Sequence, residues 1–217
     1  MAVTDTAVPL VPIDLAGFGP VIPVIVIDRV ERAVPMARAL VEGGVRVLEV
    51  TLRTAAALGA IEAIARDVPD AVVGAGTLRD ADDVRSARAA GARFGVSPGY
   101  SAAVAAACRE VSLPLLPGVA TATEVMRAAD AGFRFLKFFP ASAAGGPAML
   151  KAWASPFADV VFCPTGGIGI DTAPSWLALP NVKVVGGSWL TPADALAAGD
   201  WDRITRLARE ASALRKG

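Results

Sequence analysis

The chain of 217 residues contains no histidine and only two cysteines. Imidazoles and clustered thiolates are the usual ligands of catalytic zinc and related transition metals, so their absence argues against a metal centre. Cys108 falls in an alanine-rich helical stretch and Cys163 in an apolar strand, without the CxxC spacing of redox or zinc motifs. We therefore expect two free, buried thiols, no metal and no cofactor.

An excess of charge of either sign is also missing, because 21 basic residues balance 21 acidic residues. No basic block appears, which argues against nucleic acid or an anionic membrane surface as a partner. The first 20 residues lack a charged n-region and are interrupted by Pro9, Pro12 and Pro20, so they fit neither a signal peptide nor a membrane span. The expected location is the cytoplasm.

The remaining chain repeats one pattern, in which short apolar runs alternate with alanine-rich amphipathic stretches of helical length. Near-continuous Val, Ile and Leu runs are typical of parallel strands covered on both faces. Eight such units favour an α/β fold, a single-domain (β/α)8 TIM barrel over 1–217 with 1–20 as an N-terminal extension, rather than a doubly wound open sheet. The expected strands are 21–27, 45–52, 71–77, 93–97, 113–117, 133–139, 160–164 and 182–185.

Lys137 is set apart from the other three lysines by its aromatic neighbours, in the run FRFLKFFP at 133–140. Such neighbours remove water from an ammonium group and disfavour its charge, and a neutral amine can attack a ketone to form a Schiff base. Alternatively, the ammonium reaches water from the strand end. Lys151 and Lys216 fit solvated surface positions, and Lys183 enters its strand at the opposite end of the barrel.

Catalytic residues of such barrels lie where the strands end, and Glu49, Arg53, Thr77 and Lys137 all do so. We expect these four to converge. Glu49 lies in an apolar strand, where a carboxylate without a partner is costly. Partial burial raises the pKa of a carboxyl group and suits it to proton transfer beside a Schiff base. An ion pair with Arg53 or Lys137 is the alternative, and it is compatible with that role.

The guanidinium of Arg53 and the hydroxyl of Thr77 are suited to holding the carboxylate of an α-keto acid beside the lysine. Arg53 also fits a rim charge paired with an acidic neighbour. Phe139 and Pro98 are expected to wall the same pocket, although isolated residues of these types more often belong to a core.

Paired glycines follow the last two expected strands, at Gly166-Gly167 and Gly186-Gly187. Without side chains, backbone N–H groups can approach an anion, and these two loops commonly hold phosphate in barrel enzymes. Either pair alone is more typical of a tight turn, but the two together predict a phosphate site. Gly145-Gly146 either shapes the same pocket or opens a helix.

Six motifs, in order, resemble the class I 2-keto-3-deoxy-6-phosphogluconate (KDPG, Entner-Doudoroff) aldolases. They are GVRVLEVTLRT at 44–54, GAGT at 74–77, SPG at 97–99, KFFPA at 137–141, PTGGI at 164–168 and GSWL at 187–190. The similarity runs from about Pro20 to the helix at 201–210. One departure is Ser142, which stands where the family pattern often has Glu, and it bears on loop detail more than on the reaction.

The resemblance implies metal-free cleavage of KDPG to pyruvate and glyceraldehyde 3-phosphate, with a Schiff base on Lys137 and proton transfer by Glu49. It also implies that Arg53 and Thr77 hold the pyruvyl carboxylate and that the protein is a homotrimer. The other implied substrate contacts are Phe139 at the methyl group, Thr165 at the sugar hydroxyls, and Gly166, Gly167, Gly187 and Ser188 at the phosphate.

Several alternatives stay open at this point. Some family members also cleave 4-hydroxy-2-oxoglutarate, which needs no phosphate site, and the galactonate epimer of KDPG differs in one stereocentre. A non-catalytic sugar-phosphate-binding barrel would use Lys137 only as an ion-pair partner. A metal-free phosphosugar isomerase would use Glu49 as its base. Neither of these last two predicts covalent trapping of pyruvate.

Overall fold

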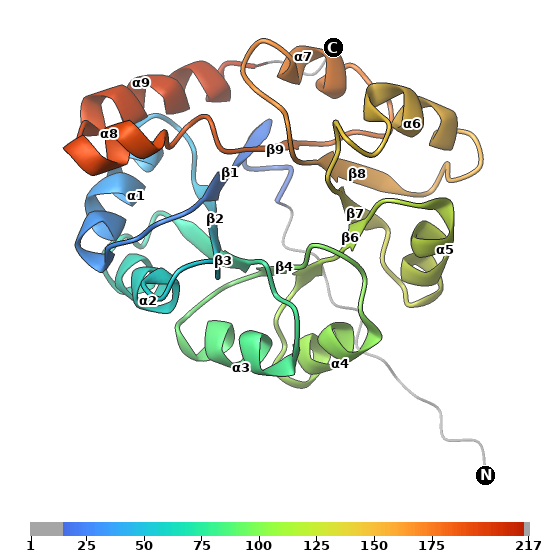
Figure 1. The fold of residues 1–217 in the computed structure, drawn as a ribbon, viewed down its shortest axis with the longest axis horizontal. Coiled ribbons are helices and arrows are strands. Elements are labelled where there is room, and N and C mark those ends of the chain that lie inside the picture. The colour runs from blue at the N-terminus through green and yellow to red at the C-terminus, as the bar shows by residue number, and fades with distance from the viewer. Residues whose placement is uncertain (1–14, 215–217) are drawn as a thin grey trace.

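The computed structural model describes residues 15–214, in which strands form an inner ring and helices surround them (Figure 1). The strands are β1 (Val21–Ile25), β2 (Val47–Thr51), β3 (Val72–Gly76), β4 (Gly95–Val96), β5 (Leu115–Leu116), β6 (Gly118–Val119), β7 (Phe135–Phe138), β8 (Val161–Pro164) and β9 (Val185–Gly187). The helices are η1 (Val30–Arg32), α1 (Ala33–Glu42), α2 (Ala57–Asp67), α3 (Ala81–Ala89), α4 (Ala102–Glu110), α5 (Ala122–Asp130), α6 (Gly146–Trp153), α7 (Ala173–Leu177), α8 (Ala193–Ala198) and α9 (Trp201–Ser212).

The strand ladder closes into a barrel. Its strands pair in parallel in the orders β5-β4-β3-β2-β1-β9 and β6-β7-β8. β5 and β6 are one barrel strand interrupted at Pro117, which has no N–H for the ladder. Bridges from Phe162 to Val182 and from Thr165 to Gly186 join β8 to β9. The described residues therefore confirm the predicted (β/α)8 fold.

The expected strands differ from the observed ones mainly at their ends. The last strand was expected at 182–185, but β9 comprises Val185–Gly187, and Val182 makes only an isolated bridge. The reason is that Gly186 and Gly187 continue the ladder with β1, although they carry no side chain that would mark a strand. Lys183 precedes β9 and is exposed at the end of the barrel away from the carboxyl ends, as expected.

Polar caps begin several of the outer helices. Asp80 accepts hydrogen bonds from the backbone of the first turn of α3, and Asp200 does the same for α9. Thr121 and Glu124 form a capping box at the start of α5. Because such caps satisfy N–H groups that have no partner within the helix, they define where each helix leaves its loop.

The ring of helices closes where α9 lies beside α1 (Figure 1). A Cβ atom on Gly43 would lie 2.4 Å from that of Ala208, so the two helices approach closely. Thr205 Oγ1 donates to the carbonyl of Ala39 at 3.1 Å, and Ser212 Oγ donates to that of Gly43 at 2.6 Å. These contacts bring the last described helix onto the first one and complete the outer layer.

The inside of the barrel is filled at the amino-terminal ends of the strands. The apolar cluster there comprises Leu15, Ile22, Val47, Val72, Phe94, Val96, Leu116, Cys163 and Val184. Because alternate residues of a strand share a face, the positions two residues after Val47 and Phe135 also point inward. Those positions are Glu49 and Lys137. Both side chains therefore lie next to this apolar cluster, on the side toward the carboxyl ends of the strands.

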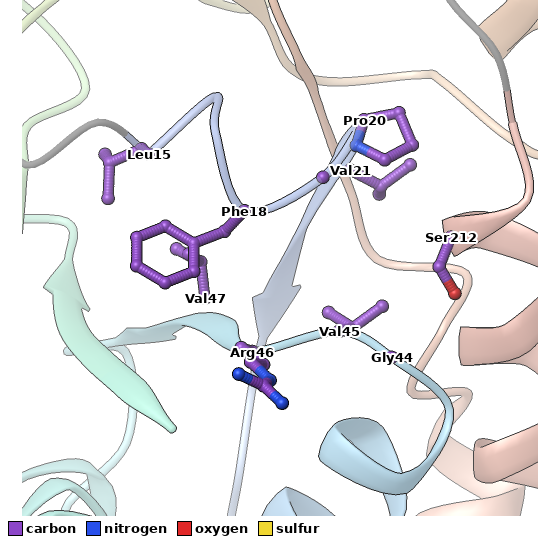
Figure 2. A pocket seen from close by; sticks show the side chains of 10 residues that line it. Leu15, Phe18, Pro20, Val21, Gly44, Val45, Arg46, Val47 and Ser212 are labelled. Carbon is purple, nitrogen blue, oxygen red and sulfur yellow. The ribbon is translucent and has the colours of Figure 1, made fainter. Parts of the chain in front are cut away.

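Residues 15–20 cover the amino-terminal end of the barrel, where Figure 2 shows Leu15 and Phe18 beside Val47, with Ser212 of α9 at the edge. The crevice between them has a volume of about 10 Å³, which is room for about one water molecule. This crevice is therefore a packing feature rather than a ligand pocket. The assignment of 1–217 to one domain, with 1–20 as an extension, stays a prediction because residues 1–14 lie outside the described residues.

No helix within residues 15–214 is long and apolar enough to cross a membrane.

Gly74 gives a test of how tightly the interior is packed. A Cβ atom at Gly74 would lie 2.4 Å from the ring of Phe94, which is fully buried. Gly74→Ala should therefore lower the free energy of unfolding by about 1–3 kcal/mol, as overpacking does. Gly99→Ala is the matched control, because no atom lies within 4 Å of its added Cβ. Equal denaturation midpoints for the two variants would contradict this packing.

Candidate active site

Lys137 and Glu49 form a buried ion pair inside the barrel. Lys137 Nζ lies 3.0 Å from Glu49 Oε1 and 3.4 Å from Oε2. The two residues stand on β7 and β2, and they are 4% and 3% exposed. Of the two partners expected for Glu49, the structure therefore selects Lys137 rather than Arg53. The ammonium does not reach bulk water, which removes the alternative of a solvated lysine at the strand end.

The pair holds two charged groups whose side chains are almost fully buried. Removing one partner of a buried pair typically costs about 3–5 kcal/mol, because the other charge stays uncompensated. The ring of Phe139 adds a cation–π contact, with its centroid 5.5 Å from Lys137 Nζ. Of the aromatic neighbours in the sequence, Phe139 thus contacts the ammonium, and the carboxylate of Glu49 is its charged partner.

The two cysteines are free and buried, as predicted. Cys163 pairs in register with Lys137, next to the ion pair. Burial raises the pKa of the Cys163 thiol to about 12, and the charge of Lys137 opposes this shift only partly. Burial likewise raises the pKa of Cys108, in α4, to about 12. The neutral thiol of Cys163 therefore leaves the charge balance of the pair undisturbed at physiological pH.

Two strand glycines leave room for the side chains of Glu49 and Thr165. A Cβ atom on Gly76 would lie 2.3 Å from Glu49 Oε1, and one on Gly186 would lie 2.2 Å from Thr165 Oγ1. Neither site can take even a methyl group without moving the polar atom beside it. These strand glycines thus set the positions of Glu49 and Thr165.

Arg53 and Thr77 extend the site beyond the ion pair. Arg53 Nε donates to Thr77 Oγ1 at 3.2 Å, and Arg53 makes no ion pair within residues 15–214. Thr77 has a φ of 65°, a conformation that is strained for a β-branched residue and that is often found at functional sites. The arrangement favours an anion clamp over the alternative of a paired rim charge.

Two threonines flanking Arg53 anchor its loop to β1. Thr51 Oγ1 donates to the carbonyl of Ile25 at 2.8 Å, and Thr54 Oγ1 donates to that of Ile27. Sequence reasoning did not single out these threonines, because the acceptor of a hydroxyl on a neighbouring strand is visible only in the tertiary structure. They hold the turn that directs Arg53 toward the cavity.

A cavity of about 210 Å³ opens at the carboxyl ends of the strands. Seven of the predicted site residues line it, namely Arg53, Phe139, Thr165, Gly166, Gly167, Gly187 and Ser188. Gly186, from the second predicted glycine pair, lines it too, and three further lining residues were not predicted, namely Val24, Val26 and Ile168. The alternation of inward residues along the first strand was the signal that could have found the two valines.

Not every predicted residue lies on the cavity wall. Lys137 and Glu49 are not among its lining residues, but Phe139, whose ring contacts Lys137 Nζ, is one of them. Pro98 is exposed and is not a lining residue, so its role as a pocket wall stays a prediction. Its carbonyl oxygen would lie 2.3 Å from a Cβ on Gly118, so this loop packs against β6. Gly145 and Gly146 open α6 and do not line the cavity.

The glycine loops after β8 and β9 present unpaired donors to the cavity. Gly166 and Gly167 have φ values of 104° and 74°, which glycine adopts far more readily than other residues. The backbone N–H groups of Gly167, Ile168 and Ser188 find no acceptor within the described part of the chain. Backbone N–H groups without acceptors at a cavity wall are the kind of donor that binds anions in proteins.

Trp189 packs against the backbone of the glycine loop after β9. A Cβ on Gly187 would lie 1.7 Å from the indole ring, so the ring occupies that face of the backbone. The indole N–H is buried and has no partner among residues 15–214. The ring therefore supports the loop by packing and not by hydrogen bonding.

No group of three or more Cys, Asp or Glu residues within residues 15–214 is arranged to hold a metal ion. The polar groups gathered at this site are an amine, a carboxylate, a guanidinium and backbone donors.

Comparisons with known proteins agree with this geometry. The family profile described as "Aldolase: KDPG and KHG aldolase" matches residues 15–207. The 2-dehydro-3-deoxy-phosphogluconate aldolase of Dickeya dadantii is 56% identical over 195 residues, covering 90% of this chain and 92% of that protein. The KHG/KDPG aldolase of Escherichia coli K12 is 55% identical over 193 residues, covering 89% and 91%.

A solved structure of similar shape carries a covalent ligand. The KDPG aldolase of Legionella pneumophila, with pyruvate captured at low pH as a covalent carbinolamine intermediate, superposes with a TM-score of 0.89 at 46% identity. The match covers 92% of this chain and 97% of that one. From its motifs, its barrel and these similarities, the chain belongs to the KDPG and KHG aldolase family.

Proposed function

We propose that this protein is a class I aldolase that cleaves 2-keto-3-deoxy-6-phosphogluconate to pyruvate and glyceraldehyde 3-phosphate through a Schiff base on Lys137. The observation that carries the proposal is the buried pair of Lys137 and Glu49, 3.0 Å apart, beside a cavity rimmed by unpaired backbone N–H groups. The names of the close relatives, and the covalent pyruvate in the Legionella structure, support it.

The ion pair supplies the nucleophile. When the ammonium of Lys137 transfers a proton to Glu49, the amine gains a lone pair and Glu49 becomes a carboxylic acid. No net charge is created or moved to solvent in this step, so burial does not oppose it as it would oppose loss of a proton to water. The amine then attacks the C2 ketone, and the hydroxyl of the resulting carbinolamine leaves as water when Glu49 returns a proton.

The protonated imine then acts as the electron sink for bond cleavage. Glu49 takes the proton of the C4 hydroxyl, the C3–C4 electron pair moves into the imine, and glyceraldehyde 3-phosphate departs. The enamine that remains on Lys137 receives a proton at C3 by way of Glu49, and hydrolysis releases pyruvate. One carboxyl group thus serves every proton transfer, in accord with its place beside Nζ.

Recognition is divided among the remaining residues. Arg53 and Thr77 bind the pyruvyl carboxylate, Phe139 packs at the methyl side, and Thr165 contacts the sugar hydroxyls. The phosphate binds the backbone N–H groups of the two glycine loops and the hydroxyl of Ser188, which is exposed at the cavity.

Cleavage of 4-hydroxy-2-oxoglutarate to pyruvate and glyoxylate is proposed as a second activity. The Escherichia coli relative carries both activities in its name. The same lysine and glutamate would serve, and the glycine loops would stay empty. The loops favour the phosphorylated compound as the main substrate. The galactonate epimer stays an alternative, because the orientation of one hydroxyl group separates it from KDPG.

Borohydride trapping tests the covalent step. Wild-type protein reduced in the presence of pyruvate should gain one pyruvyl group, which peptide mapping should place on Lys137. Lys137→Ala should lose both the adduct and turnover, and Lys137→Arg should lose them while retaining a cation beside Glu49. Lys183→Ala, which alters an exposed lysine, is the control and should trap normally.

Absence of an adduct in folded wild-type protein would reject the aldolase. The binding-protein or isomerase alternatives would then take its place. Near-normal aldolase activity in folded Lys137→Ala would reject the same mechanism independently.

Glu49→Gln tests the proton transfers. The amide retains the shape of the side chain but cannot accept a proton, so kcat should fall by about 10²–10⁴-fold. Some imine should still form, since amine attack requires only a neutral lysine. Pre-steady-state trapping and steady-state kinetics would be measured together, with Glu62→Gln on the exposed face of α2 as the control. An unchanged kcat would remove Glu49 from the mechanism.

A homotrimer is proposed from the family resemblance. Exposed large apolar side chains away from the cavity, such as Leu58 and Met126, are compatible with partner surfaces. Sedimentation equilibrium should give three times the chain mass of 22.1 kDa, and a monomer at micromolar concentration would contradict it. The cytoplasmic location stays a prediction.

A further inference from the structure

We propose that Ser142 is a positioning residue that orients the phosphate-binding donors of the loop after β8. The inference rests on the proposed function, because it takes that loop as the phosphate subsite. Ser142 lies in the loop between β7 and α6, does not line the cavity and has no part in the covalent chemistry.

Three hydrogen bonds tie the loop of Ser142 to the glycine loop. Ala141 N donates to the carbonyl of Thr165 at 2.8 Å, and Ser142 N donates to that of Gly166 at 3.1 Å. Ser142 Oγ donates to the carbonyl of Gly167 at 3.1 Å. Three successive carbonyl groups of the loop after β8 therefore accept hydrogen bonds from the loop that follows β7.

The bonds determine where the N–H groups of the loop point. A peptide unit is planar, and its trans C=O and N–H are directed oppositely. Holding the Gly166 carbonyl on Ser142 N turns the N–H of Gly167 the other way. Holding the Gly167 carbonyl on Ser142 Oγ does the same for the N–H of Ile168. Gly167 and Ile168 line the cavity, and their N–H groups have no acceptor in the described chain.

Without such restraint this segment would be mobile. Glycine has the widest range of backbone conformations, so a Gly-Gly pair does not fix its own peptide planes. Ser142 also occupies the volume beside Gly167, since a Cβ on Gly167 would lie 2.6 Å from Ser142 Oγ. The serine thus restrains the loop both by bonding and by contact.

The same hydrogen bonds join the part of the active site that carries Lys137 to the proposed phosphate loop. Ser142 follows Phe139, whose ring packs on Lys137 Nζ, by three positions. The strand end that carries the Schiff-base lysine is therefore bonded to the loop that would hold the phosphate at the far end of the substrate. These hydrogen bonds therefore set in part the distance between Lys137 and the proposed phosphate subsite.

The test compares phosphate recognition with imine formation in Ser142→Ala. Loss of one neutral hydrogen bond should raise the KM for KDPG, and weaken the binding of inorganic phosphate, by about 2- to 10-fold. The rate of borohydride trapping with pyruvate, which has no phosphate, should stay close to that of wild type. Ser142→Thr keeps the hydroxyl and should restore most of the affinity.

Ser175→Ala is the matched control. Ser175 Oγ is also exposed and donates to a backbone carbonyl, that of Thr172, at 2.8 Å, but it lies in α7 and does not line the cavity. An unchanged affinity for phosphate in Ser142→Ala would overturn the proposal. So would an equal loss of pyruvate trapping, or an equal effect of Ser175→Ala, because each would indicate a general structural role.

Phosphate binding also separates this proposal from the proposed function. Titration with inorganic phosphate alone, followed by calorimetry, needs no turnover. If wild type fails to trap pyruvate yet binds phosphate more tightly than Ser142→Ala, the aldolase is rejected and the positioning role stands. If wild type traps pyruvate but both proteins bind phosphate equally, the aldolase stands and the positioning role is rejected.

Discussion

The ion pair of Lys137 and Glu49 is the constraint on which the rest of this structure depends. Two charges inside a barrel are stable only if they compensate each other, so β2 and β7 must present their side chains to the same point. The residues around the pair are compatible with this geometry. Apolar side chains fill the barrel below the pair. Gly76 leaves room for the carboxylate, and burial keeps the neighbouring thiol of Cys163 neutral.

The proposed chemistry and the proposed recognition use different parts of the polypeptide. The covalent step relies on side chains carried by strands, where hydrogen bonding on both sides and close packing leave little freedom. The phosphate site relies on backbone N–H groups in glycine loops, which are free to move unless something restrains them. Trp189 supports one loop by packing, and the loop of Ser142 holds the other by hydrogen bonds. The glycine loops of the proposed phosphate site are thus held in place by residues that need not touch the substrate.

Much of the fold could be predicted because parallel strands buried on both faces leave continuous apolar runs in the sequence. The prediction failed where the ladder runs through residues without that signal. β9 continues into Gly186 and Gly187, and the fifth barrel strand is broken at Pro117, which lacks a donor. Within the site, the residues that close strands were predicted by type and position, and seven of the predicted residues line the cavity. Val24, Val26, Thr51 and Thr54 were missed because apolar and hydroxyl side chains at strand ends look like ordinary core or turn residues.

The sequence by itself determined the fold class, the family and the set of reactive groups, because hydrophobic periodicity and short motifs are local properties of the chain. Only the tertiary structure decided which partner Glu49 takes, since Lys137 and Arg53 were equally available until the strands were placed around the barrel. It also decided that Arg53 donates to Thr77 and that Ser142 holds the Gly167 carbonyl. The physical reason is the same in each case. Hydrogen bonds and ion pairs form within about 3 Å, and no local pattern reports distances between segments that are far apart in the chain.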